Sequence, residues 1–230
     1  MLKAQEITKT FGNLQVLKGI DLDIKQGEIV SIVGASGAGK STLLQILGTL
    51  DRPDTGKVWI ENEEITALSD KNLSFFRNQK IGFIFQFHNL LAEFTALENV
   101  CMPAWIGSEM SKNSGLAKKN NEKYISEKAI ILLEKLGLGH RLNHLPSELS
   151  GGEQQRTAVA RALINDPLLI FADEPSGNLD SQNARDLHKL FFQLRDELGH
   201  TFVMVTHNDE LANMADRKLE MHDGMITKGH

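Results

Sequence analysis

The chain has 230 residues, and 25 Lys and Arg against 30 Asp and Glu leave a formal net charge of −5. This length suits one large domain or a core with a subdomain, because domains average about 150 residues. The 41% apolar and 24% charged residues exclude a mainly disordered chain, and the modest glycine and proline content excludes a collagen-like one.

Cysteine content and hydropathy narrow the class of protein further. The single cysteine, Cys101, excludes a disulfide framework within the chain and a multi-cysteine metal site, and it indicates a reducing compartment. No apolar run reaches the ~20 residues of a membrane helix, and the first residues lack the apolar stretch of a secretion signal. We therefore expect a chain that does not cross a membrane by itself. Its mild acidity argues against broad binding to nucleic acid.

The first third of the chain predicts strands around a glycine-rich loop. Ile20, Leu22 and Ile24 alternate with polar residues, which is the period of a half-buried strand. A β-branched run at 29–33 stops at a glycine-rich segment, and apolar residues at helical spacing follow it. A second apolar run, at 81–87, predicts another strand.

The middle of the chain is predicted to be mostly helical. Thr95 and Glu98 form a capping box that opens a helix. The polar, lysine-rich stretch at 107–121 is expected to be a solvated loop. Apolar residues at helical spacing then end at Gly137, and a further helix follows Ser150.

The last third returns to an alternation of strands and helices. Apolar runs at 168–172 and 201–206 predict buried strands, and between them lies an amphipathic helix that Gly199 ends. The Asp-Gly pair at 223–224 resembles a hairpin turn. This alternation predicts an α/β fold with a mainly parallel sheet.

The glycine-rich loop has the pattern G-x-x-x-x-G-K-[ST] between a predicted strand and a predicted helix, which is the context of a phosphate-binding loop. Glycines let backbone N–H groups converge on phosphates, and Lys40 reaches the β- and γ-phosphates. Ser41 is placed to bind Mg²⁺, and Thr42 to bond a phosphate oxygen. A glycine turn that only joins strand to helix is the alternative, which the pattern and its context disfavour. The predicted binding residues are Gly34, Ala35, Ser36, Gly37, Ala38, Gly39, Lys40, Ser41 and Thr42.

Two carboxylates, Asp173 and Glu174, follow the apolar run that starts at residue 168. Parallel sheets present their ligand-binding residues at such strand ends, so the pair resembles a Walker B element. Asp173 would hold Mg²⁺, and Glu174 would orient and deprotonate the attacking water. The alternative is a solvated strand end before a turn at Pro175.

The stretch L-S-G-G-E-Q-Q at 149–155 is the most discriminating motif. Ser150 and Glu153 form a capping box, so Ser150, Gly151 and Gly152 lie at a helix N-terminus, which attracts anions. Alone, the stretch is an ordinary helix start. Beside the phosphate-binding loop and the paired carboxylates, in that order, it resembles the signature motif of the ATP-binding cassette (ABC) family. The resemblance covers essentially the whole chain.

The resemblance implies roles for residues that spacing does not identify. Phe11 matches the aromatic residue that stacks on adenine. Gln86 matches the Q-loop glutamine, which contacts Mg²⁺ or the attacking water, and His207 matches the switch histidine at the γ-phosphate. Without the resemblance, these residues are equally well a packing aromatic, a capping amide and a helix cap.

The resemblance also implies the fold and the cofactors. It implies an α/β P-loop NTPase (RecA-like) core with an N-terminal antiparallel β subdomain and an inserted α-helical subdomain. The whole chain, 1–230, would be one ABC ATPase domain, with 1–86 and 165–230 as core and β subdomain and 87–164 as the helical subdomain. The implied ligands are ATP and Mg²⁺.

The resemblance further implies an assembly. Two chains of this family pair head-to-tail as an ATP-dependent homodimer, so that the signature residues of each contact the nucleotide of the other. Integral membrane permease subunits would hold the dimer, as a peripheral protein, at the cytoplasmic face of the bacterial inner membrane. No nucleic acid is implied. A groove between the Q-loop and the helical subdomain would receive a permease helix, with Phe85, Phe87, Leu90 and Leu91 as candidate lining residues.

Within the family, the segments at 86–100, 156–163 and 173–180 most resemble the branch of ATPases that drives lipoprotein release from the inner membrane. Macrolide or peptide export and cell-division complexes are the alternatives. Ala92 and the long polar stretch at 108–121 depart from the pattern of the branch. A soluble ABC ATPase acting on nucleic acid would need a coiled-coil insertion or a second cassette, and a sensor without turnover would not need Glu174 and His207.

Overall fold

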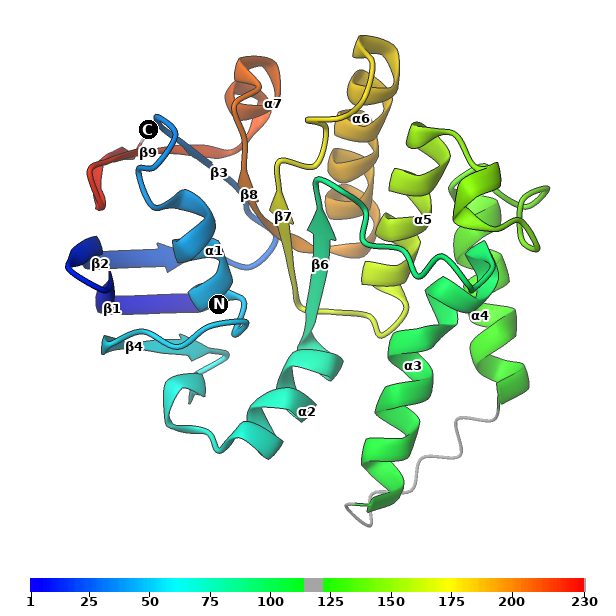
Figure 1. Ribbon diagram of the computed structural model, residues 1–230, viewed down its shortest axis with the longest axis horizontal. Coiled ribbons are helices and arrows are strands. Elements are labelled where there is room, and N and C mark those ends of the chain that lie inside the picture. The colour runs from blue at the N-terminus through cyan, green and yellow to red at the C-terminus, as the bar shows by residue number, and fades with distance from the viewer. Residues whose placement is uncertain (114–121, 230) are drawn as a thin grey trace.

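The computed structural model describes residues 1–113 and 122–229, and these form two β-sheets with helices packed around them (Figure 1). The antiparallel sheet lies at one side of the molecule, the mixed sheet in the middle, and helices α3, α4 and α5 at the other side. Over these described ranges, none of the helices combines the length and the apolar character needed to span a membrane.

The mixed sheet has the strand order β10-β9-β3-β8-β7-β6. All its strands run parallel except β10, which pairs antiparallel with β9. The strands predicted near 29–33, 168–172 and 201–206 are confirmed, and the strand predicted at 81–87 ends earlier, at Phe85. Their bounds are β3 (Ile29–Val33), β6 (Ile81–Phe85), β7 (Leu169–Asp173), β8 (Thr201–Val205), β9 (Arg217–His222) and β10 (Met225–Gly229).

The antiparallel sheet has the order β2-β1-β4-β5. Ile20, Leu22 and Ile24 are all buried on β2, and the polar residues between them are exposed, which confirms the predicted half-buried strand. The bounds are β1 (Leu2–Phe11), β2 (Leu14–Ile24), β4 (Thr55–Ile60) and β5 (Glu63–Glu64).

The helices lie in the segments that connect the strands. The predicted helices that end at Gly137 and Gly199 and the one that starts after Ser150 are confirmed. Short 3-10 turns lie at η1 (Ile65–Ala67) and η2 (Pro146–Glu148). The helices are α1 (Lys40–Leu47), α2 (Asp70–Lys80), α3 (Ala96–Asn113), α4 (Glu122–Lys135), α5 (Gly151–Leu163), α6 (Ser181–Leu198) and α7 (Asp209–Met214).

The central strands separate two hydrophobic cores. Successive residues of a strand point to opposite faces, so Phe171 enters the core shared with α1 and the antiparallel sheet. Its neighbours Ile170 and Ala172 enter the core shared with helices α3 to α7. Each core therefore holds its own set of helices against one face of the same sheet.

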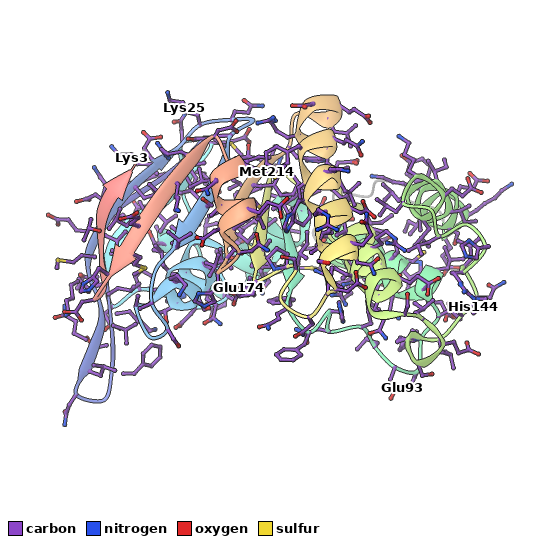
Figure 2. The ribbon with its side chains drawn as sticks, turned by 90° about the horizontal axis from the view of Figure 1, so that it is seen from above. Lys3, Lys25, Glu93, His144, Glu174 and Met214 are labelled. Atoms are coloured by element: carbon purple, nitrogen blue, oxygen red, sulfur yellow. The ribbon has the colours of Figure 1, made fainter. Side chains whose placement is uncertain are left out.

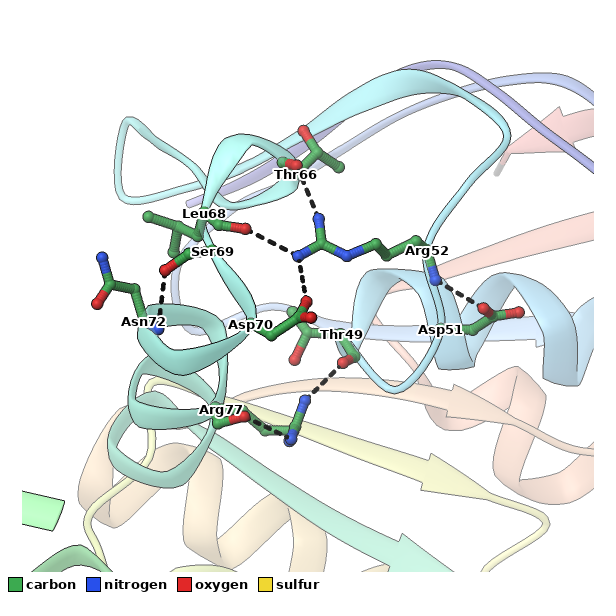
Figure 3. Close-up of polar contacts among 10 residues, drawn as sticks. Thr49, Asp51, Arg52, Thr66, Leu68, Ser69, Asp70, Asn72 and Arg77 are labelled. Carbon is green, nitrogen blue, oxygen red and sulfur yellow. Dashed lines mark hydrogen bonds and ion pairs between the residues drawn. The ribbon is translucent and has the colours of Figure 1, made fainter.

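A group of polar contacts joins the loop after α1 to the start of α2 (Figure 3). The Arg52 guanidinium donates to the carbonyl oxygens of Thr66 and Leu68 at 3.1 and 2.8 Å and to the Asp70 carboxylate at 2.8 Å. Arg77 of α2 donates to the carbonyl oxygen of Thr49 at 2.7 Å. These bonds hold α2 beside the loop that follows α1.

The predicted loop at 107–121 is wrong for its first residues, because α3 continues to Asn113. Residues 114–121 lie outside the described residues. The polar residues of this stretch indicated exposure to solvent, but the exposed face of a helix is polar as well, so polarity alone does not predict a loop. Contacts with α2 favour the helix: Asn78 Nδ2 donates to the carbonyl oxygen of Pro103 at 2.9 Å, and a Cβ on Gly107 would lie 2.4 Å from Asn78 Oδ1.

The predicted capping box at the start of α3 is confirmed. The Thr95 amide and hydroxyl both donate to Glu98 Oε2 at 2.8 Å, and the Glu98 amide donates to the Thr95 hydroxyl at 3.3 Å. One turn further, buried Asn99 accepts a bond from the Leu91 amide at 2.8 Å. The Asn99 side chain also donates to the carbonyl oxygens of Leu91, Phe94 and Thr95.

Replacing this asparagine tests how much the loop before α3 depends on it. Asn99→Ala removes four side-chain bonds to partly buried backbone groups of Leu91, Phe94 and Thr95, so we expect the free energy of unfolding to fall by about 2 kcal/mol in a urea titration. Asn213→Ala, at an exposed position of α7, is the control and should change stability by less than about 0.5 kcal/mol. Equal stability of the two variants would contradict the assigned role.

Candidate functional site

The phosphate-binding loop curls around the ammonium group of Lys40. Lys40 is buried, and its Nζ donates to the carbonyl oxygens of Gly34 and Ala35 at 2.8 and 2.9 Å. Gly34 has φ of +149°, and a Cβ there would lie 2.1 Å from the carbonyl oxygen of Met221. The loop therefore needs glycine at this position, because backbone from β9 packs directly against it.

The C-terminal hairpin supports this loop from behind. The predicted Asp-Gly turn is confirmed between β9 and β10, where Met225 pairs with His222. The amide of Gly224 donates to the carbonyl oxygen of Ala38 at 3.1 Å, and its own carbonyl oxygen accepts from the Lys18 amide at 3.0 Å. The turn thus joins the phosphate-binding loop to β2.

A cavity of about 670 Å³ lies in front of the loop. Its lining includes residues of the phosphate-binding loop, both predicted carboxylates, Gln86 and His207. Phe11 and the signature residues are not part of the lining. Gly34, Ala35 and Ala38 belong to the loop but do not line the cavity. The lining residues are Leu14, Val16, Ser36, Gly37, Gly39, Lys40, Ser41, Thr42, Gln86, Asp173, Glu174, Gly177, Val205 and His207.

Oxygen atoms of Ser41 and Asp173 meet at one side of the cavity. Ser41 Oγ donates to Asp173 Oδ1 at 3.1 Å. Burial raises the pKa of Asp173, and the bond from Ser41 and the charge of Lys40 oppose that rise. Among the described residues, no three His, Cys, Asp or Glu side chains gather as a metal site. A cation here would need further oxygens from phosphate or water, which is how Mg²⁺ binds beside nucleotides.

Glu174 and His207 contact each other in the lining of the cavity. Glu174 Oε2 accepts from the His207 amide at 3.0 Å, and Glu174 Oε1 lies 3.1 Å from His207 Nε2. Only 16% of the Glu174 side chain is exposed, against 58% for His207. Figure 2 labels Glu174 in the loop that follows β7. The carboxylate is thus held by a residue that solvent or a ligand can reach.

Gln86 follows β6 and contacts the segment after Glu174. Its Nε2 donates to Asn178 Oδ1 at 3.4 Å, and Asn178 Nδ2 donates to the Gln86 carbonyl oxygen at 3.0 Å. The next turn depends on Arg161 of α5, which donates to the carbonyl oxygens of His88 and Asn89 at 2.6 and 2.5 Å. No sequence motif assigned this role to Arg161, and its only signal was an arginine within a predicted helix.

The signature residues lie at the start of α5, outside the cavity. Ser150 caps the helix, and its amide and hydroxyl donate to Glu153 Oε2 at 2.8 Å, which confirms the predicted capping box. The bond from the Ser150 amide, with help from the Ser150 hydroxyl and Arg141, lowers the pKa of Glu153 to about 2. None of Ser150, Gly151 and Gly152 lines the cavity, so one chain alone does not bring signature and phosphate-binding loop together.

Phe11 lies at the end of β1, beside the cavity but not in its lining. Its ring is 52% exposed, and Lys9 Nζ lies 5.3 Å from the ring centroid. Phe11 pairs across the β1–β2 hairpin with Leu14, which does line the cavity. Leu14 and Val16 were not predicted as site residues, although apolar residues on a strand close to Phe11 are a usable signal.

The ABC transporter family profile matches residues 17–177. This chain belongs to the ABC transporter family. It is an ATPase subunit, it binds adenine nucleotides, and it hydrolyses ATP. The resemblance carried by the three sequence motifs is thereby confirmed.

Curated relatives match the chain almost end to end. It is 63% identical to the lipoprotein-releasing system ATP-binding protein LolD of Cytophaga hutchinsonii, with 98% of both chains covered. It is 58% identical to the protein of the same name from Bacteroides thetaiotaomicron, with 99% of this chain and 100% of that protein covered.

Solved structures of ABC cassettes match the fold. The dimeric structure of MJ0796, a bacterial ABC transporter cassette, aligns with a TM-score of 0.89 at 40% identity, covering 100% of this chain and 98% of that one. A post-hydrolysis state of the same cassette, bound to ADP and Pi, aligns with a TM-score of 0.84 at 38% identity over the same shares. The predicted α/β P-loop fold is confirmed.

Removing the buried ammonium group tests the phosphate-binding loop. Lys40→Ala removes a charged donor from the cavity, so we expect ATP affinity in a binding titration to fall by at least about tenfold. Lys25→Ala, at an exposed turn far from the cavity lining, is the control and should bind ATP as the unmodified protein does (Figure 2). Unchanged affinity in Lys40→Ala would contradict this assignment.

Proposed function

We propose that this chain powers the release of lipoproteins from the bacterial inner membrane, as the ATPase subunit of an ABC transporter. The observation that carries the proposal is the 63% identity to LolD with both chains covered almost in full. Differences in cargo among ABC transporters reside in their membrane subunits, and an ATPase that matches its relatives end to end fits the same type of membrane subunit.

The residues that line the cavity have separate roles in the proposed hydrolysis of ATP. Lys40 and the loop from Ser36 to Thr42 hold the phosphates, by charge and by hydrogen bonds. Ser41, Asp173 and Gln86 supply oxygen ligands suited to Mg²⁺. When bound, Mg²⁺ neutralises charge that develops on the phosphate oxygens.

Glu174 is the general base in this proposal. Its carboxylate accepts a proton from the attacking water, and His207, bonded to the same carboxylate, lies ready to contact the γ-phosphate. Phe11 stacks on the adenine ring from the edge of the cavity. The exposed ring and the exposed imidazole are both accessible to a nucleotide.

We further propose that the chain acts as a head-to-tail homodimer. Ser150, Gly151 and Gly152 lie outside the chain's own cavity, and a helix N-terminus favours a phosphate group. Their natural ligand is the γ-phosphate of the nucleotide held by the partner. The dimeric state of the similar cassette MJ0796 supports this arrangement.

Removing the general base separates ATP binding from hydrolysis. Glu174→Gln keeps the size of the side chain, so ATP binding and an ATP-dependent dimer in size-exclusion chromatography should persist, while turnover falls by about 10³-fold. Glu197→Gln, at an exposed position of α6, is the control for an equivalent loss of charge. Full turnover in Glu174→Gln would contradict the proposed mechanism.

A second cavity supports attachment to membrane subunits. It measures about 420 Å³ and lies between α2, β6, α3 and α5, lined by Phe85, Ile106, Met110 and Arg161 among others. Of the four apolar residues proposed for the groove, only Phe85 lines this cavity. Phe87, Leu90 and Leu91 do not line it, although Phe87 and Leu91 are exposed. We propose that a permease helix occupies it, which holds the chain at the cytoplasmic face of the inner membrane. In this proposal, residues 87–164 are the helical subdomain, and its helices α3 and α5 form one wall of the cavity.

A charge placed in this cavity should weaken attachment. Ile106→Glu introduces a carboxylate where an apolar helix face would pack, so co-expressed permease subunits should no longer co-purify with the chain in detergent. Ile131→Glu is a matched control, because Ile131 on α4 is similarly exposed, 54% against 49%, but lies outside the cavity. Equal recovery of permease with both variants would contradict the proposed site.

A further inference from the structure

The two residues after Glu174 are held by side chains from two different helices. Gln155 Nε2 of α5 donates to the carbonyl oxygen of Pro175 at 2.7 Å. His188 Nε2 of α6 lies 3.1 Å from the Ser176 hydroxyl. Gln155 and His188 are 0% and 1% exposed, so both bonds are shielded from water. Neither residue lines the nucleotide cavity.

The backbone at Glu174 explains why such bonds are needed. Glu174 has φ of +46°, in the left-handed region, and a conformation of this kind costs on the order of 1–3 kcal/mol for a residue other than glycine. It persists only where the surroundings hold the chain in place. The Glu174 amide donates to the Val205 carbonyl oxygen at 2.9 Å, and the Glu174 carbonyl oxygen accepts from the Gly177 amide at 3.0 Å. The peptide group that joins Pro175 to Ser176 lies between these bonded ends, and the bond from Gln155 to its carbonyl oxygen fixes its orientation.

We propose that Gln155 and His188 are positioning residues that keep the Glu174 carboxylate aimed at the attacking water. They act through Pro175 and Ser176 and do not touch the nucleotide. The proposal rests on the role of Glu174 as general base. Small displacements of a catalytic group, of about 1 Å, lower reaction rates by up to about 10²-fold, so two buried hydrogen bonds, one to the Pro175 carbonyl oxygen and one to the Ser176 hydroxyl, have a measurable effect on turnover.

Gln155 also links the two nucleotide sites of the proposed dimer. It lies on the same helix as Ser150, five residues further along, which is about 7 Å at the helical rise per residue. The start of α5 faces the partner's nucleotide, whereas Pro175 follows the carboxylate that serves the chain's own nucleotide. A displacement of α5 on nucleotide binding would therefore reach the segment after Glu174 through this hydrogen bond.

The substitutions that test the proposal keep side-chain size. Burial lowers the pKa of His188 against the opposing charge of Glu210, and His188→Phe removes the hydrogen bond to Ser176 while keeping a ring of similar size. His188→Gln retains an amide that can bond Ser176. Gln155→Met keeps the length of the side chain and loses the donor. Leu194→Val, also buried on α6 but remote from the segment, is the control for a modest loss of stability.

We expect His188→Phe and Gln155→Met each to lower kcat by about tenfold or more, with KM and ATP affinity unchanged. His188→Gln should recover most of the rate, and Leu194→Val should retain all of it at a temperature where every variant is folded. In single-turnover measurements on Glu174→Gln, adding His188→Phe should cause no further loss, because the histidine acts through the carboxylate that is already absent.

Three outcomes would overturn the proposal, and they are distinguishable. If Glu174→Gln loses turnover while both positioning variants keep the unmodified kcat, the positioning role falls and the general base stands. If His188→Phe lowers the single-turnover rate equally with and without Glu174, the histidine has a general structural role. If Glu174→Gln keeps full turnover, the proposed function itself falls, and the positioning role falls with it.

Discussion

The site depends on the in-register pairing of three parallel strands. Phe85 of β6 pairs with Asp173 of β7, and Asp173 pairs with Val205 of β8, so the strands end on one line. The residues that follow the strands are then brought to the same edge of the sheet, which places Gln86, Glu174 and, two positions after Val205, His207 around one cavity. A shift of one residue in either pairing would turn the side chains at the strand ends to the opposite face.

The phosphate-binding loop is attached to that edge by its own contacts. Ser41 bonds Asp173 from the start of α1, and the Gly224 turn bonds Ala38 from the other side. The loop is thereby held between a strand end and a hairpin that lie far apart in sequence. Recognition of phosphate depends on these local donors and charges, so the net charge of −5 carries no information about the ligand.

In the proposed dimer, each active site contains residues from both chains. In the proposed dimer, α5 presents Ser150 to the partner, while the same helix contacts Pro175 beside the chain's own Glu174 and holds the turn after Gln86 through Arg161. One helix thus contacts both the segment after Glu174 and the turn beside the proposed permease cavity. In the proposed assembly, this helix would connect the membrane side to the site of hydrolysis.

The sequence by itself determined the features that depend on neighbouring residues. The phosphate-binding loop, the capping boxes at Thr95 and Ser150, and the half-buried strand at Ile20 to Ile24 each need only local spacing and residue type, and all were predicted correctly as structures. Only the tertiary structure decided that Gln155 bonds Pro175, that His188 bonds Ser176, and that α3 continues through a polar segment. Those features depend on how helices pack against a sheet and against one another. Such packing joins residues distant in sequence, and no local pattern encodes it.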